Sequence, residues 1–475
     1  MSHLGEERGD DLSYSCTEDS RCHVLSHLAV TKMVQYYTVV LGSLAAIAPL
    51  AAALPNGLGA TPAMGYSSWN DCGSMRNNGP TGWCWDTEAH IQNVTEYLIS
   101  SGLAKLGYVR INIDEGWLKG RDKATGKMVE DTEKFPSGMK GMGDWIKQHD
   151  TYAGSGEKMH YGLYSCRGTV QCGSKTYSAV GSYGHEAADV DWMVAAGADY
   201  LKIDSCGATN YTHAGSFAQY AKFRDAMNAT GKQVWFSLCG WHHWYSPPDT
   251  SIGYKGGASL GNSWRIAGDG KTWPDLTQCM NTQAAVASYN GPGGWSDPDL
   301  LVGPEVYIGG QTDAQARAQF TMWSLFPANL LISQNVLAWT PYALETYSNE
   351  ELVAINQDPL GSPAKRIVGG DLTFPCHPTH AAPCNSTNVW GRELSGGKFA
   401  LGFVNNADSA AKITCDGSCF DALNISSSVA ALKVRDLWAH ADVATLTRPF
   451  TFTAAVNGSG FAAAYKLTPS TVIHG

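Results

Sequence analysis

The chain has 475 residues, which is enough for one large domain followed by a smaller one. Its formal net charge is -10, and its lysines and arginines are scattered rather than gathered in a stripe. Such a charge pattern offers no surface for a nucleic-acid backbone, so we exclude nucleic acid as a partner.

The first 53 residues indicate export. Residues 1–32 are polar and lack a hydrophobic period, and we interpret them as a gene-model extension. Residues 33–53 are typical of a secretory signal peptide, because the apolar run Val39–Leu50 is short for a bilayer span and small residues follow it before Leu54. A signal anchor is the alternative, since the segment lacks a cluster of positive charge. We expect a secreted protein without membrane attachment after cleavage.

Sequons and cysteines agree with export. Six Asn-X-Ser/Thr tripeptides could accept glycans, although such tripeptides also arise by chance; they begin at Asn93, Asn210, Asn228, Asn385, Asn424 and Asn457. Eleven of the 13 cysteines follow residue 53, so at least one of these is a free thiol. Short spacings predict disulfides within loops or hairpins: Cys72 with Cys84, Cys376 with Cys384, and Cys415 with Cys419. No CxxC pair recurs and the histidines do not cluster, so we expect no metal site.

Between Thr61 and about Asn335, short apolar runs with polar or acidic ends alternate with stretches of helical period. The runs predict eight strands, at Gly65–Asn70, Val109–Glu115, Tyr161–Cys166, Tyr200–Cys206, Val234–Trp241, Trp264–Asp269, Trp295–Asp299 and Leu330–Gln334. Predicted helices include Ala89–Ser101, Ala187–Ala196, Phe217–Thr230, Thr277–Ser288 and Ala314–Ser324. This alternation predicts a TIM barrel, an α/β fold, over residues 54–361, with functional residues at the C-terminal ends of its strands.

The sequence pattern changes in the last part of the chain. Short β-prone segments, separated by Gly, Asn and Ser pairs, lie at Asn388–Glu393, Phe399–Asn405, Val434–Leu437 and Gly460–Leu467. They predict a small antiparallel β domain over residues 362–475. We find no chemical motif in it.

The run Tyr200–Cys206, YLKIDSC, predicts a strand that delivers a carboxylate to a site. Residues two apart on a strand point the same way, so Lys202 and Asp204 share one side of it. A neighbouring cation lowers the pKa of a carboxyl group and keeps it ionised as a nucleophile. The alternative is an ordinary ion pair at a strand end.

Asp269 is the best partner for Asp204. It ends the run SWRIAGD at the sixth predicted strand, two strands round the barrel, and Arg265 precedes it by four residues. Two carboxyl groups about 5 to 5.5 Å apart are the machinery of a retaining glycosidase. The alternative for Asp269 is a loop-capping aspartate, since glycines flank it.

Seven stretches identify a family. They are LPNGLGATPAMGYSSWN, LGYVRINIDEGW, FPSGMKGMGDWI, YLKIDSC, SWRIAGD, GPGGWSDPDLL and AINQDPLG, and in this order they resemble glycoside hydrolase family 27, the α-galactosidases. The resemblance implies a TIM barrel followed by an antiparallel β-sandwich, and hydrolysis of terminal α-D-galactosyl residues with retention and without metal or cofactor. It implies Asp204 as the nucleophile and Asp269 as the general acid/base, so the pKa of Asp269 should be raised.

The resemblance also implies substrate-binding residues. It makes Trp69 and Tyr164 walls of the sugar pocket, although core packing is the alternative for Trp69. It makes Asp114 and Asp299 hydroxyl acceptors, Lys202 and Arg265 hydroxyl donors, and Cys172 and Cys206 a disulfide that pins a loop beside the nucleophile. The full predicted set is Trp69, Asp114, Glu115, Tyr164, Lys202, Cys206, Trp241, Arg265 and Asp299. The expected partner is a galactoside-bearing or arabinopyranoside-bearing oligosaccharide or polysaccharide.

Glu115 departs from the family pattern, which has a second aspartate at this position. Within the family, a Glu here resembles the β-L-arabinopyranosidases. A longer side chain could occupy the volume that the CH2OH group of galactose needs, and L-arabinopyranose lacks that group. A methylene is worth ~1 to 3 kcal/mol in discrimination, so we expect a shift of preference rather than exclusion. The alternative is that the backbone relaxes and galactose still binds.

Other departures indicate a divergent subgroup. Cys166-Arg167 replaces an aspartate and a small residue, Leu300 replaces a methionine, and Cys239-Gly240-Trp241-His242-His243 lacks an acidic residue. A non-catalytic sugar-binding descendant is the rival interpretation, and the presence of both carboxylates favours an active enzyme. A metal-dependent TIM-barrel hydrolase would need histidines at several strand ends, which are missing apart from that one pair.

Overall fold

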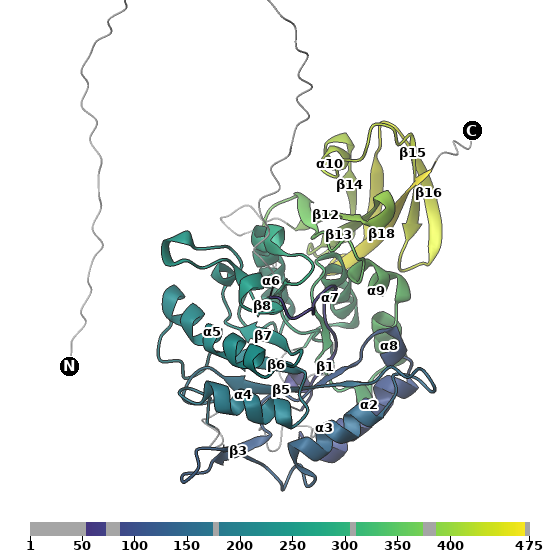
Figure 1. Cartoon of the computed structure of the whole chain (residues 1–475). Coiled ribbons are helices and arrows are strands. Elements are labelled where there is room, and N and C mark those ends of the chain that lie inside the picture. The colour runs from purple at the N-terminus through teal and green to yellow at the C-terminus, as the bar shows by residue number, and fades with distance from the viewer. Residues whose placement is uncertain (1–53, 73–85, 174–179, 305–309, 374–385, 471–475) are drawn as a thin grey trace, which may run out of the picture. The chain divides into compact units, whose positions relative to one another are not determined.

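The computed structural model describes residues 54–72, 86–173, 180–304, 310–373 and 386–470 (Figure 1). The expected extension and signal peptide, residues 1–53, lie outside the described residues. So do Cys84, Cys376 and Cys384, and with them two of the three disulfides expected from spacing. Among the described residues, no helix is long and apolar enough to cross a membrane.

Eight parallel strands form the barrel, in the order β10-β1-β2-β5-β6-β7-β8-β9. Their bounds are β1 Met64–Ser67, β2 Arg110–Asn112, β5 His160–Cys166, β6 Tyr200–Asp204, β7 Trp235–Cys239, β8 Ser263–Arg265, β9 Trp295–Asp297 and β10 Leu330–Ile332. A parallel bridge between Leu301 and Ile332 joins the chain after β9 to β10 and closes the sheet. All eight predicted strands and the predicted barrel are confirmed.

Helices surround these strands in Figure 1. They are α1 Trp69–Cys72, α2 Glu88–Ser100, α3 Gly138–Gln148, α4 Glu186–Ala195, α5 His213–Ala229, α6 Trp273–Val286, α7 Asp313–Leu325, α8 Pro341–Tyr347 and α9 Glu350–Asn356, with the hairpin β3 Leu118–Arg121 and β4 Met128–Glu130. α5 and α6 begin four residues before their predicted starts, because Thr212 and Thr272 cap them ahead of the apolar period.

The strands bury two different faces. Leu201 and Ile203 of β6 are fully buried and belong to the large core that also contains Val190 of α4 and Phe223 of α5. Tyr200 belongs instead to a separate small cluster with side chains of β7, β9 and β10, which fills part of the barrel interior. Because side chains alternate along a strand, Lys202 and Asp204 point inward as Tyr200 does. The barrel therefore presents these two residues to its interior, as predicted.

The C-terminal region is an antiparallel β-sandwich, as the family resemblance implied. One sheet has the order β11-β12-β13-β18-β15-β16, with bounds Lys365–Val368, Thr387–Leu394, Lys398–Asn405, Phe461–Ser470, Ala431–Asp436 and Ala441–Thr447. The other pairs β14 Ala411–Cys415 with β17 Phe452–Val456. Leu401 and Phe403 of the first sheet share a core with Ile413 and Val456 of the second. The predicted Cys415–Cys419 disulfide joins β14 to α10, Gly417–Asp421.

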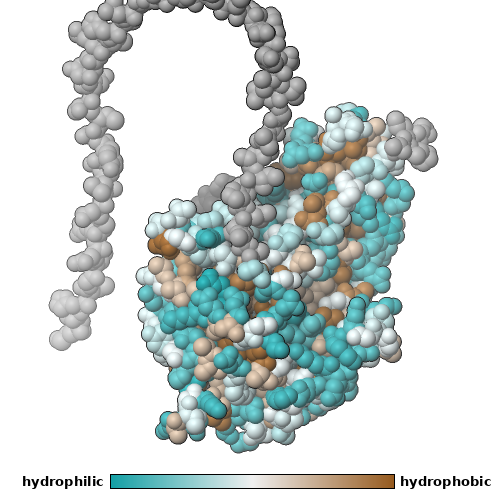
Figure 2. All heavy atoms as spheres, viewed as in Figure 1, coloured by the Kyte–Doolittle hydropathy of each residue, from teal (hydrophilic) through white to brown (hydrophobic). Residues whose placement is uncertain are grey.

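The barrel and the sandwich are packed against each other. The buried Arg392 of β12 donates hydrogen bonds to the carbonyl oxygens of Ser324, at 3.2 Å, and Ile355, at 2.9 Å. A Cβ at Gly402 of β13 would come within 2.2 Å of the Leu325 side chain, so a larger residue there would displace this side chain of α7. On the face shown in Figure 2, hydrophobic side chains are interspersed with hydrophilic ones over both regions.

Candidate active site

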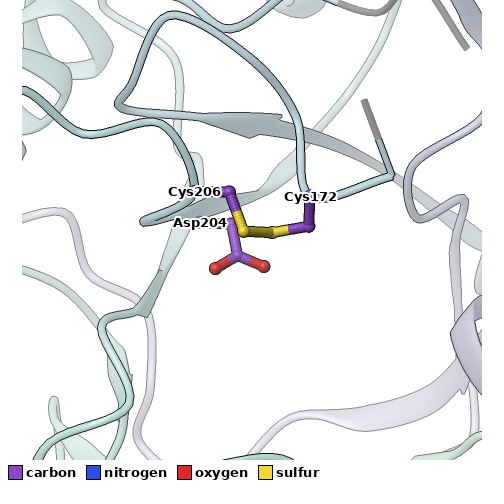
Figure 3. Close-up of side chains that lie close together, drawn as sticks. All are labelled: Cys172, Asp204 and Cys206. Atoms are coloured by element: carbon purple, nitrogen blue, oxygen red, sulfur yellow. A yellow bond between two sulfur atoms is a disulfide. The ribbon is translucent and has the colours of Figure 1, made fainter. Parts of the chain in front are cut away.

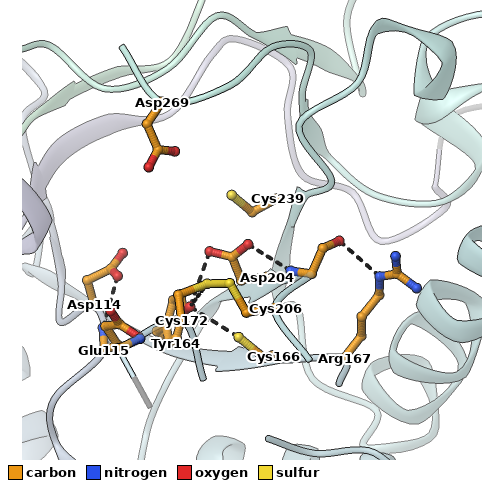
Figure 4. Close-up of a disulfide and its surroundings, with 12 residues drawn as sticks. Asp114, Glu115, Tyr164, Cys166, Arg167, Cys172, Asp204, Cys206, Cys239 and Asp269 are labelled. Atoms are coloured by element: carbon orange, nitrogen blue, oxygen red, sulfur yellow. Dashed lines mark hydrogen bonds between the residues drawn. A yellow bond between two sulfur atoms is a disulfide. The ribbon is translucent and has the colours of Figure 1, made fainter. Parts of the chain in front are cut away.

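A pocket of about 360 Å³ lies at the C-terminal ends of the barrel strands. Its lining residues come from the ends of β2, β5, β6 and β7 and from the loops that follow β1, β5 and β8; they are Trp69, Asp114, Tyr164, Cys172, Lys202, Asp204, Cys206, Trp241, Gly268 and Asp269. In Figure 4 the carboxylates of Asp204 and Asp269 face the same open space from opposite sides. The two carboxylates that the sequence singles out therefore share one pocket.

Asp204 is held by hydrogen bonds on both carboxylate oxygens. The backbone N–H of Ser205 donates to its Oδ1 at 2.7 Å, and the hydroxyl of Tyr164 donates to its Oδ2 at 3.2 Å. The side chain is almost fully buried at the end of β6. These contacts fix its orientation, which a nucleophile needs for in-line attack.

Asp269 is more open and lies among cations. Its side chain is 36% exposed, and its Oδ1 accepts a hydrogen bond from Arg265 Nη2 at 3.2 Å. Lys271 Nζ lies 3.7 Å from its Oδ2. Arg265 also contacts Asp299 Oδ1 through Nη1 at 2.8 Å, so one guanidinium orients two carboxylates. An exposed carboxylate on the pocket wall can exchange protons with water and substrate.

The pKa values differ from the predicted ones. Burial raises the pKa of Asp204 to about 6, and Asp269 and Asp114 add to this, although Lys202 and the Ser205 N–H act in the opposite sense. Lys202 lowers this pKa as predicted, but desolvation outweighs it. The pKa of Asp269 is lowered, because Arg265, Lys202 and Lys271 together outweigh its desolvation. The expectation of a raised pKa for Asp269 is therefore wrong.

Lys202 anchors one side of the pocket. Its ammonium group lies 2.7 Å from Asp114 Oδ2, and it stands over the rings of Tyr164, at 5.0 Å, and Trp69, at 5.9 Å. The nearby carboxylates, Asp114 above all, outweigh its own desolvation and raise its pKa, so the amine stays charged. A cation and a carboxylate fixed side by side can donate to and accept from neighbouring sugar hydroxyls.

Two predicted binding residues lie beside the pocket rather than on it. Arg265 and Asp299 line a small adjacent cavity, together with Asp114 and Lys202. Asp299 Oδ2 accepts a hydrogen bond from the backbone of Gly270 at 2.7 Å, so it ties β9 to the loop that carries Asp269. Burial, with help from neighbouring carboxylates, raises the pKa of Asp299 to about 7, against the effect of Arg265. The structure thus favours orientation of Asp269 as the role of Arg265.

Glu115 also lies outside the pocket lining that the structure describes. Its side chain is fully buried, and its Oε2 accepts a hydrogen bond from the backbone N–H of Gly173 at 2.9 Å. The extra methylene therefore reaches the loop that carries Cys172. We expected this carboxylate in the volume of the sugar CH2OH group, and the structure places it against that loop instead.

The disulfide expected from the family resemblance, Cys172–Cys206, is present and lines the pocket. The thiols of Cys166, Cys239 and Cys279 are free and buried. Within the described ranges, one group of potential metal ligands occurs, Cys172, Asp204 and Cys206 (Figure 3). Both of its sulfurs are in the disulfide, so they are not thiolate ligands, and the group does not fit a metal site.

Sequence reasoning gave no role to Gly268, which lines the pocket, or to Arg167, which lies behind Asp204. Trp241, which it did find, has φ of 63°, a left-handed conformation that bulky residues rarely adopt. Such strain is concentrated at functional sites, and here it places the indole on the pocket wall.

Two sequence profiles match the chain. The one for alpha galactosidase A matches residues 61–358, and the one for the alpha galactosidase C-terminal beta sandwich domain matches residues 384–465. Alpha-galactosidase 3 of Arabidopsis thaliana is 35% identical over 422 residues, which cover 89% of this chain and 85% of the plant protein. The chain belongs to the alpha-galactosidase family.

Solved structures of this family agree. Alpha-galactosidase I from Mortierella vinacea has a TM-score of 0.71 at 27% identity, covering 88% of this chain and 99% of that one. A GH27 β-L-arabinopyranosidase from Geobacillus stearothermophilus has a TM-score of 0.66 at 17% identity, covering 86% of this chain and 98% of that one. The second likeness shows a shared fold. The resemblance inferred from the sequence is confirmed, and the alpha-galactosidase family member described here is a glycoside hydrolase.

The pKa of Asp204 predicts an acid limb in the activity of this glycoside hydrolase. Asp204 must be ionised to attack, and its pKa of about 6 means that protonation removes the nucleophile as the pH falls below 6. Because kcat/KM reports the free enzyme and nitrophenolate leaves without a proton from Asp269, we expect kcat/KM on nitrophenyl α-D-galactopyranoside to fall roughly tenfold for each pH unit below that value. Measuring kcat/KM between pH 4 and pH 8 checks this. Full kcat/KM at pH 4 would contradict the account of Asp204.

Proposed function

We propose that the protein is a retaining exo-glycosidase that removes terminal α-D-galactosyl residues from oligosaccharides or polysaccharides by double displacement. The observation that carries this proposal is the pairing of Asp204 and Asp269 across one pocket at the C-terminal strand ends. Ion-paired Lys202 and Asp114 offer a donor and an acceptor for sugar hydroxyls beside them. Trp69 and Trp241 supply apolar walls for the sugar ring.

In the first step, a carboxylate oxygen of Asp204 attacks the anomeric carbon and the bond to the leaving oxygen breaks. Asp269 gives its proton to that oxygen, which leaves a β-linked galactosyl ester on Asp204. In the second step, Asp269 removes a proton from water, and the water oxygen attacks the anomeric carbon and releases Asp204. Two inversions give retention of the α configuration.

Asp269 needs a proton in the first step, although Arg265, Lys202 and Lys271 lower its pKa. Its side chain is 36% exposed, so a bound sugar removes water from it. Removing that water favours the protonated form, because desolvation disfavours charge. After the ester forms, Asp204 is neutral and no longer favours protonation of Asp269, which then acts as a base.

The second candidate substrate is the β-L-arabinopyranoside suggested by Glu115. The structure gives it no support, since the Glu115 carboxylate is buried against Gly173. We therefore expect the galactoside to be the better substrate. We also expect Glu115→Asp to change the ratio of kcat/KM for nitrophenyl α-D-galactopyranoside and β-L-arabinopyranoside by less than about threefold, below the effect of a methylene in direct sugar contact.

Assays of wild type and Glu115→Asp on both glycosides test the function and the substrate together. Lack of turnover of either glycoside by the folded wild type would reject the glycosidase in favour of a sugar-binding descendant. A change of tenfold or more in the ratio of the two kcat/KM values would instead show that Glu115 determines which sugar is preferred.

We also propose that the protein is exported. The Cys172–Cys206 and Cys415–Cys419 disulfides suit an oxidising compartment. Five of the six sequon asparagines lie in the described residues, and all five are exposed. Recovery of the activity only from cell lysate, with none in the medium of a eukaryotic host, would refute export.

A further inference from the structure

Arg167 is a buried cation directly after β5, behind the nucleophile. It is 1% exposed, and its guanidinium donates four hydrogen bonds. Nε donates to Ser205 Oγ at 2.9 Å, Nη1 to the carbonyl oxygen of Asn210 at 2.8 Å, and Nη2 to Ser216 Oγ at 3.1 Å. Nη1 also donates to Gln219 Oε1. The side chain thus joins β5 to the loop and helix that follow β6.

All four of these partners are neutral. In the part of the chain that the structure describes, no carboxylate lies within ion-pair distance of Arg167. The rings of Tyr220 and Tyr211 lie 5.2 and 5.3 Å from its guanidinium carbon and supply the nearest negative potential. Burying an uncompensated charge costs free energy, so we expect this buried cation to have a role other than packing.

The contacts lead from Arg167 to the reacting carboxylate through Ser205. Figure 4 shows Arg167 and Asp204 at the two ends of this path. The Ser205 hydroxyl binds Arg167, and the Ser205 backbone N–H donates to Asp204 Oδ1 at 2.7 Å. The backbone N–H of Arg167 also donates to the Asp204 carbonyl oxygen at 2.8 Å. Tyr220 and Tyr211 bind the Ser205 hydroxyl and carbonyl, at 2.9 and 3.1 Å. Every polar group of Ser205 is therefore fixed, and Arg167 provides the cationic contact.

We propose that Arg167 is a positioning residue for the nucleophile. Through Ser205 it keeps the backbone N–H aimed at Asp204 Oδ1, and its charge behind β6 favours the ionised carboxylate. Asp204 needs such help because it is buried with Asp269 and Asp114 close by. The inference deepens the proposed function and rests on Asp204 being the nucleophile.

The chain offers a matched control. Arg392, 2% exposed, is another buried arginine bound to neutral acceptors, the carbonyl oxygens of Ser324 and Ile355. It lies between the barrel and the sandwich, and it does not line the pocket. Arg392→Met therefore reports the effect of removing a buried arginine as such.

The test compares Arg167→Met, Arg167→Lys and Ser205→Ala with Arg392→Met and wild type. The measurements are kcat, KM, the acid limb of kcat/KM and the thermal midpoint. We expect Arg167→Met to lower kcat by up to roughly 10²-fold, the effect of a misplaced reacting group, with KM within about twofold. Its acid limb should move to higher pH. Arg167→Lys should return the acid limb to near its wild-type pH but recover less of kcat. Lysine keeps the positive charge but lacks the planar guanidinium group that makes several hydrogen bonds.

Ser205→Ala keeps the backbone N–H and removes the hydroxyl, so it should lower kcat by less than Arg167→Met. It also reports on the contact if Arg167→Met does not fold. Arg392→Met should lower the thermal midpoint and leave kcat and the acid limb at wild-type values. Wild-type kcat and acid limb in both Arg167→Met and Ser205→Ala would overturn the proposal, as would an equal loss in Arg392→Met.

A readout independent of turnover separates this proposal from the proposed function. A water-soluble carbodiimide modifies protonated carboxyl groups, and peptide masses report its rate at Asp204 as a function of pH. In Arg167→Met the reactive range should extend to higher pH than in wild type. If the wild type hydrolyses no glycoside but this shift occurs, the proposed function fails and the positioning role stands. An unchanged range, with or without turnover, overturns the role.

Discussion

Asp204→Asn is expected to lower kcat on nitrophenyl α-D-galactopyranoside by roughly 10⁴-fold or more, the loss typical of removing a nucleophile. The amide cannot form the ester with the anomeric carbon, while Ser205 and Tyr164 still hold the side chain. Steady-state measurements on purified protein give kcat. Residual activity within tenfold of wild type would reject Asp204 as the nucleophile.

The same substitution should not destabilise the protein. Burial raises the pKa of Asp204 to about 6 in the folded state, so its ionisation destabilises the fold as the pH rises from its unfolded pKa through that value. Above pH 6 the effect amounts to about 3 kcal/mol, since one pKa unit is worth about 1.4 kcal/mol. At pH 7, Asp204→Asn should therefore unfold at the wild-type temperature or above it.

Asp199 supplies the control at the other end of the same strand. It precedes β6 and is paired with Arg110 at 3.1 Å, Lys147 at 3.0 Å and His160 at 2.9 Å. Asp199→Asn should lower the thermal midpoint and keep kcat, the reverse of Asp204→Asn. Parallel loss of kcat in both variants would mean that Asp204 acts through the fold.

Asp269→Ala is expected to have the second largest effect. General acid and base catalysis contributes about 10² to 10⁴-fold, and this variant loses both roles. The loss should depend on the leaving group, because nitrophenolate leaves without a proton and a sugar hydroxyl does not. We expect kcat/KM to fall by roughly 10⁴-fold for a galactose-ended disaccharide and much less for the nitrophenyl galactoside.

Comparison of the two substrates with the same variant checks this expectation. Equal losses on both would show that Asp269 acts by binding or orientation alone. Lys271→Met, which removes a cation 3.7 Å from Asp269 and no carboxylate, is the matched control. Because its removal keeps the acid and takes away a cation that lowers the pKa of Asp269, it should show no greater loss on the disaccharide than on the nitrophenyl galactoside.

The barrel could be predicted because its strands carry strong local signals. The run Leu201–Ile203 alternates apolar and charged side chains and leads into Asp204, so both the strand and the side that faces the pocket follow from period two. The structure ends β8 at Arg265, whereas the apolar pattern continued to Asp269. The reason is that Arg265 binds the carbonyls of Ala267 and Gly268, which turns the chain out of the sheet.

The chemistry of single groups was harder to predict. The sequence places Lys202 two residues from Asp204, and from this alone a low pKa follows. Burial by side chains from the whole strand-end region raises the pKa of Asp204 instead, and no local sequence pattern contains that information. Asp269 shows the opposite case, since Lys271 and Arg265 are near it in sequence and their effect prevails.

Glu115 and Arg167 depend on loops that meet only in the folded chain. Glu115 is 58 residues from Gly173. The strand pattern predicts neither where the Glu115 side chain points nor where the Gly173 N–H points. Arg167 is 38 residues from Ser205 and 52 from Gln219. Sequence reasoning marked both positions as departures from the family pattern, which proved to be the useful signal, but their contacts required the structure.

The most direct test of the paired roles is the configuration of galactosyl azide formed by Asp204→Ala and Asp269→Ala with nitrophenyl α-D-galactopyranoside and azide. In Asp269→Ala, azide should attack the β-linked ester on Asp204 and give α-galactosyl azide after two inversions. In Asp204→Ala, azide should replace the nucleophile and give β-galactosyl azide after one. The anomeric proton coupling in the NMR spectrum distinguishes the products. The account predicts α from Asp269→Ala and β from Asp204→Ala, and the reverse assignment would contradict it.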